Sequence, residues 1–381
     1  MQITNITTAV VAGYKTWNYV RVETDAGLAG IGEAHPGEGV PALVEDRLKP
    51  LLVGREPRDV EPLYTHLLAH TTGLSTGGSM LGAISGVETA LWDVAGKAQG
   101  LPVYRLLGGK YRDRLRLYAD VGRGRGNVNT PESWAQRARE GVADGFEAIK
   151  FDLDHSADEL RHDAVNRGLS LAELDKMRRM VAAVRAAVGA GVDVCCDCHG
   201  SYTVRDAILL AEHLEPFDLM FLEDPVPPEN PDAMAKVAAA TTIPICTGEY
   251  VHRRDGFRRL VEEQACDLLH IDISATGGML EAKKIADLAD LYYMPAALHN
   301  IVSPVGMVAS AHVGAAIRNL HSVELPYHAD QIAWRWDLAV TSAPLIQAAK
   351  LVVPDQPGLG VDLNEAVARA HQKPGTRFFG A

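Results

Sequence analysis

Three acidic residues lie at a constant interval in the middle of the chain. Asp197 ends the apolar run VDVCCD, Glu223 lies in LMFLED and Glu249 ends IPICTGE, so that 26 residues separate each acid from the next. Alone, each of them reads as a solvated loop residue or a helix cap. The equal spacing instead predicts carboxylates at corresponding points of repeated structural units. If they converge, a cation must neutralise their repulsion, and a set of carboxylate oxygens suits Mg²⁺.

Acid–base groups close the next apolar runs. Asp272 lies in LLHIDI, His299 ends MPAALH and Glu324 lies in HSVEL. A histidine after an apolar run is usually structural. A carboxylate on the neighbouring strand, however, would fix its tautomer and make it a better base. We therefore expect Asp272 and His299 to form a catalytic dyad, with His299 as the base.

Two further residues are expected beside the same carboxylates. His199 lies two residues beyond Asp197, and this spacing puts both side chains on one face of a strand. The sequence leaves open whether His199 is a metal ligand or a general acid. Lys150 lies in the run EAIKF, and a surface lysine is the default interpretation. At a strand end it would instead bring an ammonium group to the acids.

Eight short apolar runs, each followed by a helical segment, explain how these residues could meet. Parallel strands that alternate with helices form a barrel, and their carboxyl ends all lie on the face where barrel enzymes build active sites. The predicted fold class is therefore α/β, with a TIM-like (β/α) barrel over residues 116–353. The runs are RLYADV, EAIKF, VDVCCD, LMFLED, IPICTGE, LLHIDI, MPAALH and HSVEL. A polar insertion from Asp154 to Ser170 lengthens the second unit.

The chain ends are predicted to form a different unit. The segments from MQITNITTAVVAGY to LAGIGEAH alternate around turn signals, which indicates an antiparallel meander, and residues 40–106 carry helical periodicity. We expect residues 1–115 to form a separate α+β domain. Residues 354–381 contain turns and a short helix, and periodicity does not reveal where they pack.

Composition and charge limit the kinds of partner that the protein is expected to bind. The 381 residues carry a formal net charge of −12 with no basic stripe, which argues against nucleic acid. No run is long enough to span a bilayer, and the first residues lack a signal-peptide pattern. Five cysteines, three of them crowded at Cys195, Cys196 and Cys198, are expected to be reduced core thiols rather than a zinc site. We expect a cytoplasmic protein with no membrane partner.

Motifs along nearly the whole chain resemble those of the enolase superfamily, in the branch named for mandelate racemase. Within it they resemble the sugar-acid dehydratases of the gluconate and galactonate type. The motifs are AISGVETALWDVAGKAQGLPVYRLLGG, CDCHG, FLEDPVPPEN, TGEY, HIDISATGG, ALHN and HSVEL. This resemblance implies a modified (β/α)₇β barrel, capped by an α+β domain built from both chain ends.

The resemblance also implies roles for the residues that match. It implies that Asp197, Glu223 and Glu249 bind Mg²⁺, and that Asp272 and His299 are the dyad. His199 matches the general acid of the sugar-acid dehydratases, and Glu324 matches the acid that hydrogen-bonds the substrate carboxylate. Lys150 matches the first lysine of a Lys-x-Lys motif. These assignments come from the matching motifs and not from spacing.

One departure bears on the reaction. Asp152 stands where racemases of this branch carry the second lysine, which serves them as a second base. One base and one acid suit elimination, so the expected reaction is dehydration of an aldonate or aldarate to a 2-keto-3-deoxy acid. The alternatives are an epimerase or cycloisomerase that uses the same enediolate and a non-catalytic barrel that binds a sugar acid.

Substrate choice is expected to depend on the capping domain. The candidate loop spans residues 13–19 and contains Tyr14, Lys15, Trp17 and Asn18. Arg123, after the first barrel strand, is either a contact for a distal anion or a solvated loop arginine. We expect a small-molecule sugar acid as the partner and a homo-oligomer as the assembly.

Overall fold

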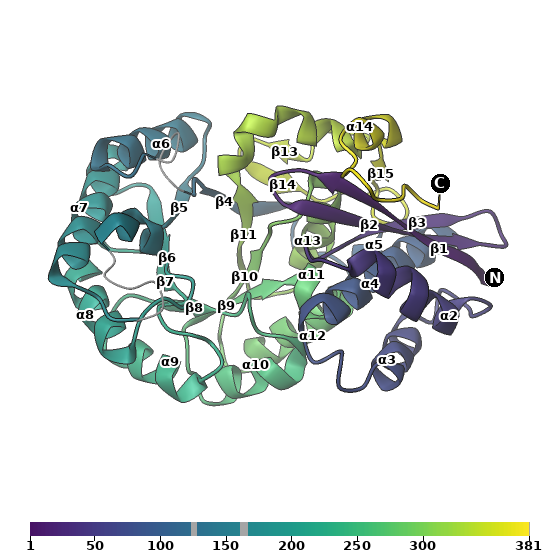
Figure 1. Ribbon diagram of the computed structural model, residues 1–381, viewed down its shortest axis with the longest axis horizontal. Coiled ribbons are helices and arrows are strands. Elements are labelled where there is room, and N and C mark those ends of the chain that lie inside the picture. Colours follow the sequence, from purple (N-terminus) through teal and green to yellow (C-terminus); the bar gives the residue numbers. More distant parts are fainter. Residues whose placement is uncertain (123–127, 161–166, 381) are drawn as a thin grey trace.

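Eight parallel strands form a closed barrel on one side of the protein (Figure 1). The structure is a computed structural model that describes residues 1–122, 128–160 and 167–380. The strands are β4 (Arg114–Asp120), β5 (Ala148–Asp152), β6 (Asp193–Asp197), β7 (Phe221–Glu223), β8 (Ile245–Thr247), β9 (Leu268–Asp272), β10 (Ala296–His299) and β11 (Leu320–Pro326). Strand β11 pairs with β4 and closes the ring. The eight predicted strands and the barrel are confirmed.

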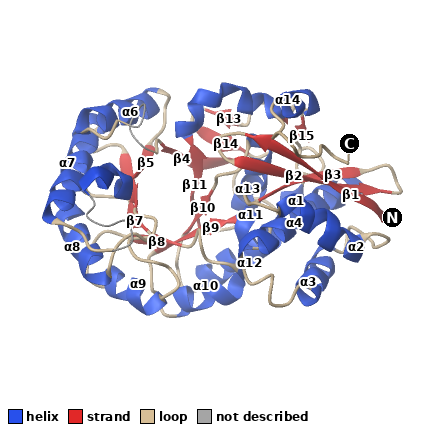
Figure 2. Ribbon diagram, in the orientation of Figure 1, coloured by secondary structure: helices blue, strands red, loops and turns tan. Residues whose placement is uncertain are grey.

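Helices surround the barrel (Figure 2) and follow seven of its eight strands. They are α6 (Pro131–Ala143), α7 (Leu171–Val188), α8 (Val204–Leu214), α9 (Pro231–Ala238), α10 (Arg253–Glu262), α12 (Met279–Asp290) and α13 (Pro304–Ala316), with the short α11 (Ile273–Thr276) before α12. This order is the (β/α)₇β arrangement. Five of the seven longer helices begin at a side chain that caps the helix amino terminus, which fixes where each loop above the barrel ends. The caps are Thr130, Ser170, Thr203, Asn230 and Ser303.

Both faces of the barrel strands are buried, so adjacent residues enter different cores. Cys195 belongs to a small cluster that takes one residue from each of β4 to β10, including Tyr118 and Phe221. Cys196 belongs to the large core that the strands share with the outer helices. All five cysteines are free and buried, so they lie in the core as expected.

The capping domain contains an antiparallel sheet of β1 (Ile3–Ala12), β2 (Thr16–Thr24) and β3 (Ala29–Ala34). Its helices are α1 (Val40–Ala42), α2 (Lys49–Leu52), α3 (Val60–His70), α4 (Gly78–Gln99) and α5 (Val103–Leu106), with a π-helical segment at Leu43–Leu48. Helix α4 lies close against β3 because both contribute glycine: a Cβ on Gly86 would approach Ala34 Cβ to 2.8 Å. The predicted meander and the helices after it are confirmed.

The C-terminal segment returns to the capping domain. Between β11 and this segment (residues 354–381) lie the 3₁₀ segment Tyr327–Leu338 (η5), β12 (Ala339–Val340), β13 (Ile346–Gln347) and β14 (Lys350–Val352), which pairs with the barrel strand β4. The segment itself contains β15 (Asp362–Leu363) and α14 (Glu365–Ala370). Backbone bridges join Phe378 to Ala9 and Gln372 to Val11 of β1, and both termini lie at the capping end in Figure 1. The domain boundaries near residues 115 and 353 stay a prediction.

Two buried glutamates of the capping domain bind the amino ends of barrel helices. Glu33 on β3 accepts hydrogen bonds from Ser303 Oγ (2.5 Å), Ser303 N (2.9 Å) and Gly306 N (3.1 Å) at the start of α13. Glu88 on α4 accepts from Met279 N (2.8 Å) and Leu280 N (3.1 Å) at the start of α12. These contacts satisfy helix N–H groups that have no partner within the helix and fix the cap above the barrel.

We expect Glu88 to make stability depend on pH near neutrality. Burial raises the pKa of Glu88 to about 7. A carboxyl whose pKa is higher in the folded state contributes stability that is full below its unfolded pKa and is lost as pH rises through about 7. The melting temperature of the wild type should therefore fall relative to that of Glu88→Gln between about pH 5 and about pH 8. Parallel melting curves for the two proteins would contradict this.

Among the described residues, no helix combines the length and the apolar composition that crossing a membrane requires.

Candidate active site

The three predicted metal ligands meet at the barrel mouth, the face formed by the carboxyl ends of the strands. Asp197 of β6 is in register with Glu223 of β7, and Glu249 lies two residues beyond the end of β8. All three side chains are buried. Ligand atoms of Glu223, Glu249 and His270 lie within 4.8 Å of one another. Those of a second group, Asp152, Asp197 and His199, lie within the same distance of one another.

Lys150 joins these two groups. Its Nζ lies 2.7 Å from Asp197 Oδ2, 2.7 Å from Glu223 Oε2 and 3.1 Å from Glu324 Oε1. Burial alone would lower the pKa of Lys150, but the charges of these three acids raise it well above its ordinary value. The side chain that reads as a surface lysine in the sequence is therefore a buried ammonium at the centre of the site.

The carboxylates fit a divalent cation. Burial and the charge of Asp197 raise the pKa of Glu223 to about 8, although the ammonium of Lys150 lowers it. Buried anions of this density are stable only when they are protonated or paired with more positive charge. Asp197, Glu223 and Glu249 offer carboxylate oxygens, the donors that hard divalent ions prefer. The acidic cluster therefore fits a divalent metal ion.

Asp272 and His299 form a close pair at the ends of β9 and β10, where they are in register. His299 Nδ1 donates a 2.6 Å hydrogen bond to Asp272 Oδ2, and Asp272 Oδ1 accepts from Ser274 N (2.7 Å) and Ser274 Oγ (2.6 Å). These contacts fix both the carboxylate and the imidazole. The other ring nitrogen, Nε2, lies 2.8 Å from Glu249 Oε2, so it faces the carboxylate cluster.

The electrostatics of His299 depend on the charge around it. Burial alone would lower its pKa, but the charges of Glu249 and Glu324 and the hydrogen bond to Asp272 raise it well above its ordinary value. A divalent cation bound to these carboxylates would offset their charge and favour the neutral ring, which can accept a proton.

Glu324 on β11 is buried beside the two cationic groups. Its Oε1 accepts from Lys150 Nζ at 3.1 Å, and its Oε2 accepts from Asn300 N at 3.2 Å. Burial raises the pKa of Glu324, whereas the charges of Lys150 and His299 lower it. The net effect raises the pKa of Glu324. A raised pKa suits a carboxyl that donates a hydrogen bond to a substrate carboxylate.

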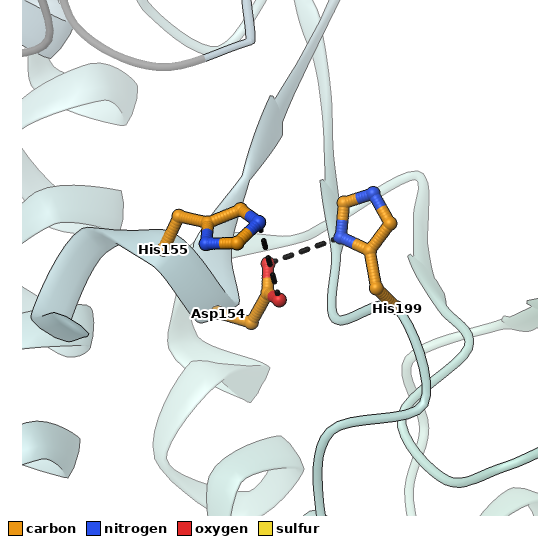
Figure 3. A group of neighbouring side chains, drawn as sticks. All are labelled: Asp154, His155 and His199. Atoms are coloured by element: carbon orange, nitrogen blue, oxygen red, sulfur yellow. Dashed lines mark hydrogen bonds and ion pairs between the residues drawn. The ribbon is translucent and has the colours of Figure 1, made fainter. Parts of the chain in front are cut away.

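His199 lies beside Asp154 (Figure 3). Its Nδ1 donates to Asp154 Oδ1 at 3.1 Å and lies 3.6 Å from Asp197 Oδ1. Burial alone would lower the pKa of His199, but the charge of Asp197 and the hydrogen bond to Asp154 raise it to about 11. The arrangement favours a protonated imidazole, as a general acid requires.

The sequence analysis expected His199 to lie on the same strand as Asp197, and this expectation was wrong. Strand β6 ends at Asp197, so His199 lies in the following turn and not on the strand. Its backbone adopts the left-handed region, with φ of 44°, and its N–H donates to Asp197 Oδ1 at 2.9 Å. The turn, and not strand alternation, brings the imidazole beside Asp197.

The sequence analysis did not identify His270, which forms a hydrogen bond with Glu223. His270 Nδ1 donates to Glu223 Oε1 at 2.5 Å, and its Nε2 accepts from Tyr118 Oη at 2.7 Å. Burial lowers the pKa of His270 to about 3, so the ring is neutral and can both donate and accept. The signal was present: His270 lies two residues before Asp272, on the same face of β9.

The predicted substrate loop lies at the turn between β1 and β2 and continues into β2. Its side chains lie on both faces of the sheet in the capping domain. Trp17 is fully buried and packs edge-on against Tyr14 and Trp334, with ring centroids 5.7 Å and 6.0 Å away. Asn18 lines a cavity of about 380 Å³ on the opposite face, beside Lys373. Adjacent strand residues face opposite ways, so the structure does not bring Trp17 and Asn18 together.

Tyr14, at the start of that loop, lies within electrostatic reach of Glu324. Burial raises its pKa, and the charges of Glu324 and Asp120 at the barrel mouth raise it further, while Arg335 lowers it. Lys15 is exposed at the turn. Arg123 lies outside the described residues. Substrate contacts by this loop stay a prediction.

Comparisons with known proteins agree with this geometry. The family model described as the mandelate racemase / muconate lactonizing enzyme N-terminal domain matches residues 4–108, and the one described as enolase C-terminal domain-like matches residues 133–367.

Two relatives and one solved structure cover almost the whole chain. A D-xylonate dehydratase of Haloferax volcanii is 46% identical over 380 residues, which cover 99% of this chain and 90% of that protein. A D-galactonate dehydratase of Ralstonia nicotianae is 34% identical over 388 residues, with 99% and 96% covered. A mandelate racemase/muconate lactonizing enzyme-like protein of Rubrobacter xylanophilus superposes with a TM-score of 0.94 at 41% identity, covering 100% of this chain and 99% of that one. The chain therefore belongs to the mandelate racemase/muconate lactonizing enzyme family of the enolase superfamily.

Proposed function

We propose that this protein is a Mg²⁺-dependent sugar-acid dehydratase that converts an aldonate or aldarate into a 2-keto-3-deoxy acid. The observation that carries the proposal is the placement of two imidazoles at one carboxylate cluster. His299 Nε2 lies 2.8 Å from Glu249, and His199 Nδ1 lies 3.6 Å from Asp197. Each ring is also held by a buried aspartate of its own. Elimination of water needs one base and one acid, and this site supplies both.

The substrate carboxylate must be stabilised before its neighbouring proton can leave. Loss of the C2 proton creates a doubly charged enediolate. Held by Asp197, Glu223 and Glu249, Mg²⁺ would supply positive charge against this developing charge. Lys150 adds an ammonium group from within the same cluster, and Glu324, with its raised pKa, donates a hydrogen bond to the substrate carboxylate.

The two histidines then move the protons. His299, fixed through Nδ1 by Asp272, removes the C2 proton with Nε2. His199, fixed through Nδ1 by Asp154, gives a proton to the departing 3-hydroxyl from its other nitrogen. The resulting enol converts to the 2-keto-3-deoxy acid. The named relatives act on D-xylonate and D-galactonate, which favours aldonates over aldarates as the first substrates to test.

An epimerase or cycloisomerase that uses the same enediolate is the second candidate, because Asp152 offers a titratable group. Burial and the charge of Asp120 raise the pKa of Asp152 to about 7, which suits a base at neutral pH. Epimerisation would need Asp152 to exchange a proton with C2 on the face opposite His299. A non-catalytic sugar-acid-binding barrel is the third candidate.

A substrate screen separates these functions. Purified protein with Mg²⁺, and the same protein after chelation, should be incubated with aldonates and aldarates and assayed for 2-keto-3-deoxy acids. We expect Mg²⁺-dependent keto-acid formation from at least one aldonate. Inversion at C2 without keto acid would support the epimerase. Binding measured by calorimetry without any turnover would support the binding barrel.

Replacing the proposed acid should separate dehydration from enolisation. His199→Asn is expected to lower dehydration by roughly 10²–10⁴-fold, the usual contribution of general acid–base catalysis. Exchange of the C2 proton in D₂O should continue, because His299 and Lys150 remain. NMR of the substrate alongside a keto-acid assay measures both rates. Unchanged dehydration would remove His199 from the mechanism, and loss of both activities would give it a structural or metal-binding role.

The assembly and its location also belong to this proposal. We propose a cytoplasmic homo-oligomer, since the free thiols fit a reducing compartment. Tyr111, Leu291 and Tyr293 are 64%, 74% and 91% exposed, and both tyrosines lie within electrostatic reach of Arg318. An exposed apolar group of this kind supports self-association. Light scattering after size-exclusion chromatography tests it.

A further inference from the structure

We propose that Asp154 is the positioning residue of the general acid, so that the site contains a second Asp–His pair. In this pair Asp154 orients His199 as Asp272 orients His299. The inference rests on the proposed dehydratase function and adds to it a residue whose role is to hold the acid in place. Asp154 itself does not contact the reacting atoms.

The contacts of Asp154 are those of a fixed hydrogen-bond acceptor. Its side chain is buried, with 3% of its area exposed. Oδ1 accepts from His199 Nδ1 at 3.1 Å, and Oδ2 accepts from Ser201 Oγ at 3.2 Å. Figure 3 shows the imidazole of His199 turned so that Nδ1 faces Asp154 and Nε2 points away from it. With both oxygens engaged from the β6 side, the carboxylate has a defined orientation.

The two Asp–His pairs come from corresponding places in the barrel. Asp272 and His299 are register partners on the neighbouring strands β9 and β10. On β5 and β6 the register partners at the strand ends are Asp152 and Asp197. Asp154 and His199 each lie two residues beyond these positions. Both pairs therefore combine a carboxylate from one strand–helix unit with an imidazole from the next, although Asp154 and His199 lie in the segments after β5 and β6 and not on the strands.

The backbone around His199 fixes its main chain but not its ring. His199 and Gly200 have φ of 44° and 67°, and Gly200 N donates to Asp224 O at 2.7 Å. The His199 side chain is 31% exposed, so packing constrains its ring less than it constrains the ring of His299, which is 8% exposed. The hydrogen bond to Asp154 decides which nitrogen faces the substrate. Without it, either nitrogen can face the barrel mouth.

His155 provides a matched control within the same cluster. Its Nε2 lies 3.7 Å from Asp154 Oδ2, beyond hydrogen-bond distance, and its ring centroid is 5.6 Å from that of His199. It therefore contacts Asp154 through charge and His199 through its ring, whereas the hydrogen bond between Asp154 and His199 does not involve it. Replacing it changes the surroundings of Asp154 while the Asp154–His199 hydrogen bond remains.

The kinetic test compares both aspartates in the Mg²⁺-loaded protein. Asp154→Ala should lower kcat for dehydration by about 10²-fold, the cost of a misplaced catalytic group. KM and the rate of C2-proton exchange should stay within about threefold of wild type. Asp154→Asn keeps an acceptor oxygen and should recover part of the loss. Asp272→Ala should instead lose exchange and dehydration together, and His155→Ala should change neither.

A purely structural role for Asp154 predicts a different pattern. It would lower exchange and dehydration by the same factor, or raise KM, and either result would overturn the proposal. Wild-type dehydration in Asp154→Ala would also overturn it. An absence of keto acid from the wild type with every substrate would instead refute the proposed function.

A substrate-free measurement keeps the two proposals distinguishable. In protein labelled with ¹⁵N-histidine, the Nδ1–H of His199 should give a downfield proton resonance, because it is hydrogen-bonded to a buried carboxylate. This resonance, assigned by its loss in His199→Asn, should disappear in Asp154→Ala and persist in His155→Ala. Its persistence in Asp154→Ala would show that Asp154 does not hold the ring, whatever the protein's substrate.

Discussion

Glu223→Gln is expected to abolish Mg²⁺-dependent turnover while the fold is retained. Glutamine has nearly the same shape and can still accept the hydrogen bond from His270 Nδ1, which is 2.5 Å long in the wild type. It removes one of the negative charges that attract the cation. The stabilisation that a metal gives to developing charge is worth several kcal/mol, and each 1.36 kcal/mol is a factor of ten in rate. We therefore expect a loss of about 10³-fold or more in kcat/KM.

The measurement pairs turnover with metal binding. Calorimetry should show weaker Mg²⁺ binding by Glu223→Gln, and circular dichroism should show an unchanged fold. Glu229→Gln is the matched control, because Glu229 is exposed in the loop that follows the same strand; it should behave as wild type. Full activity in Glu223→Gln, or in chelated protein, would contradict the assignment of the metal site.

His299→Asn is expected to stop both proton exchange and dehydration. The imidazole is the group whose Nε2 lies within the carboxylate cluster and whose Nδ1 is fixed by Asp272 at 2.6 Å. Asparagine can donate to Asp272, but its amide has no basic nitrogen. Loss of the base should lower C2-proton exchange in D₂O by roughly 10²–10⁴-fold, and dehydration by at least as much, since it follows enolisation.

Solvent exchange followed by NMR checks this directly. His213→Asn, at an exposed position on α8, controls for the substitution itself. If exchange continued at the wild-type rate in His299→Asn, the base would lie elsewhere, and Lys150 or Asp152 would become the candidate. Together with the His199 variant, this experiment assigns the two proton transfers to the two sides of the cluster.

The sequence was sufficient for the barrel and for the convergence of the carboxylates. Parallel strands in a barrel end on the same face, so a polar residue at the end of each apolar run indicates a common site. The constant interval between Asp197, Glu223 and Glu249 reflects one strand–helix unit, which is a local property of the chain. The same reasoning predicted the neighbouring positions of Asp272 and His299, because consecutive strands of the barrel pair with one another.

The roles of residues in the middle of a strand, or in the segment after it, could be recognised only from the tertiary structure. His270 lies within an apolar run, and only its contacts with Glu223 and Tyr118 show that it is a buried polar support. Asp154 begins a segment that reads as a polar insertion. The structure turns this residue inward, onto an imidazole that the chain places 45 residues later. Composition marks such a segment as polar, but it does not show which of its polar groups is buried.

The charge states of the site are also a tertiary property. Lys150 is an ordinary lysine in the sequence, and it becomes the buried counter-ion of three acids only because β5, β6, β7 and β11 bring them together. Trp17 and Asn18 are adjacent in the predicted loop, yet the pleat of β2 sends one into the core and the other to a separate cavity. Sequence spacing thus determined which strand ends carry chemistry. Burial and long-range contacts, which depend on how distant segments pack, decided the direction and the charge of each side chain.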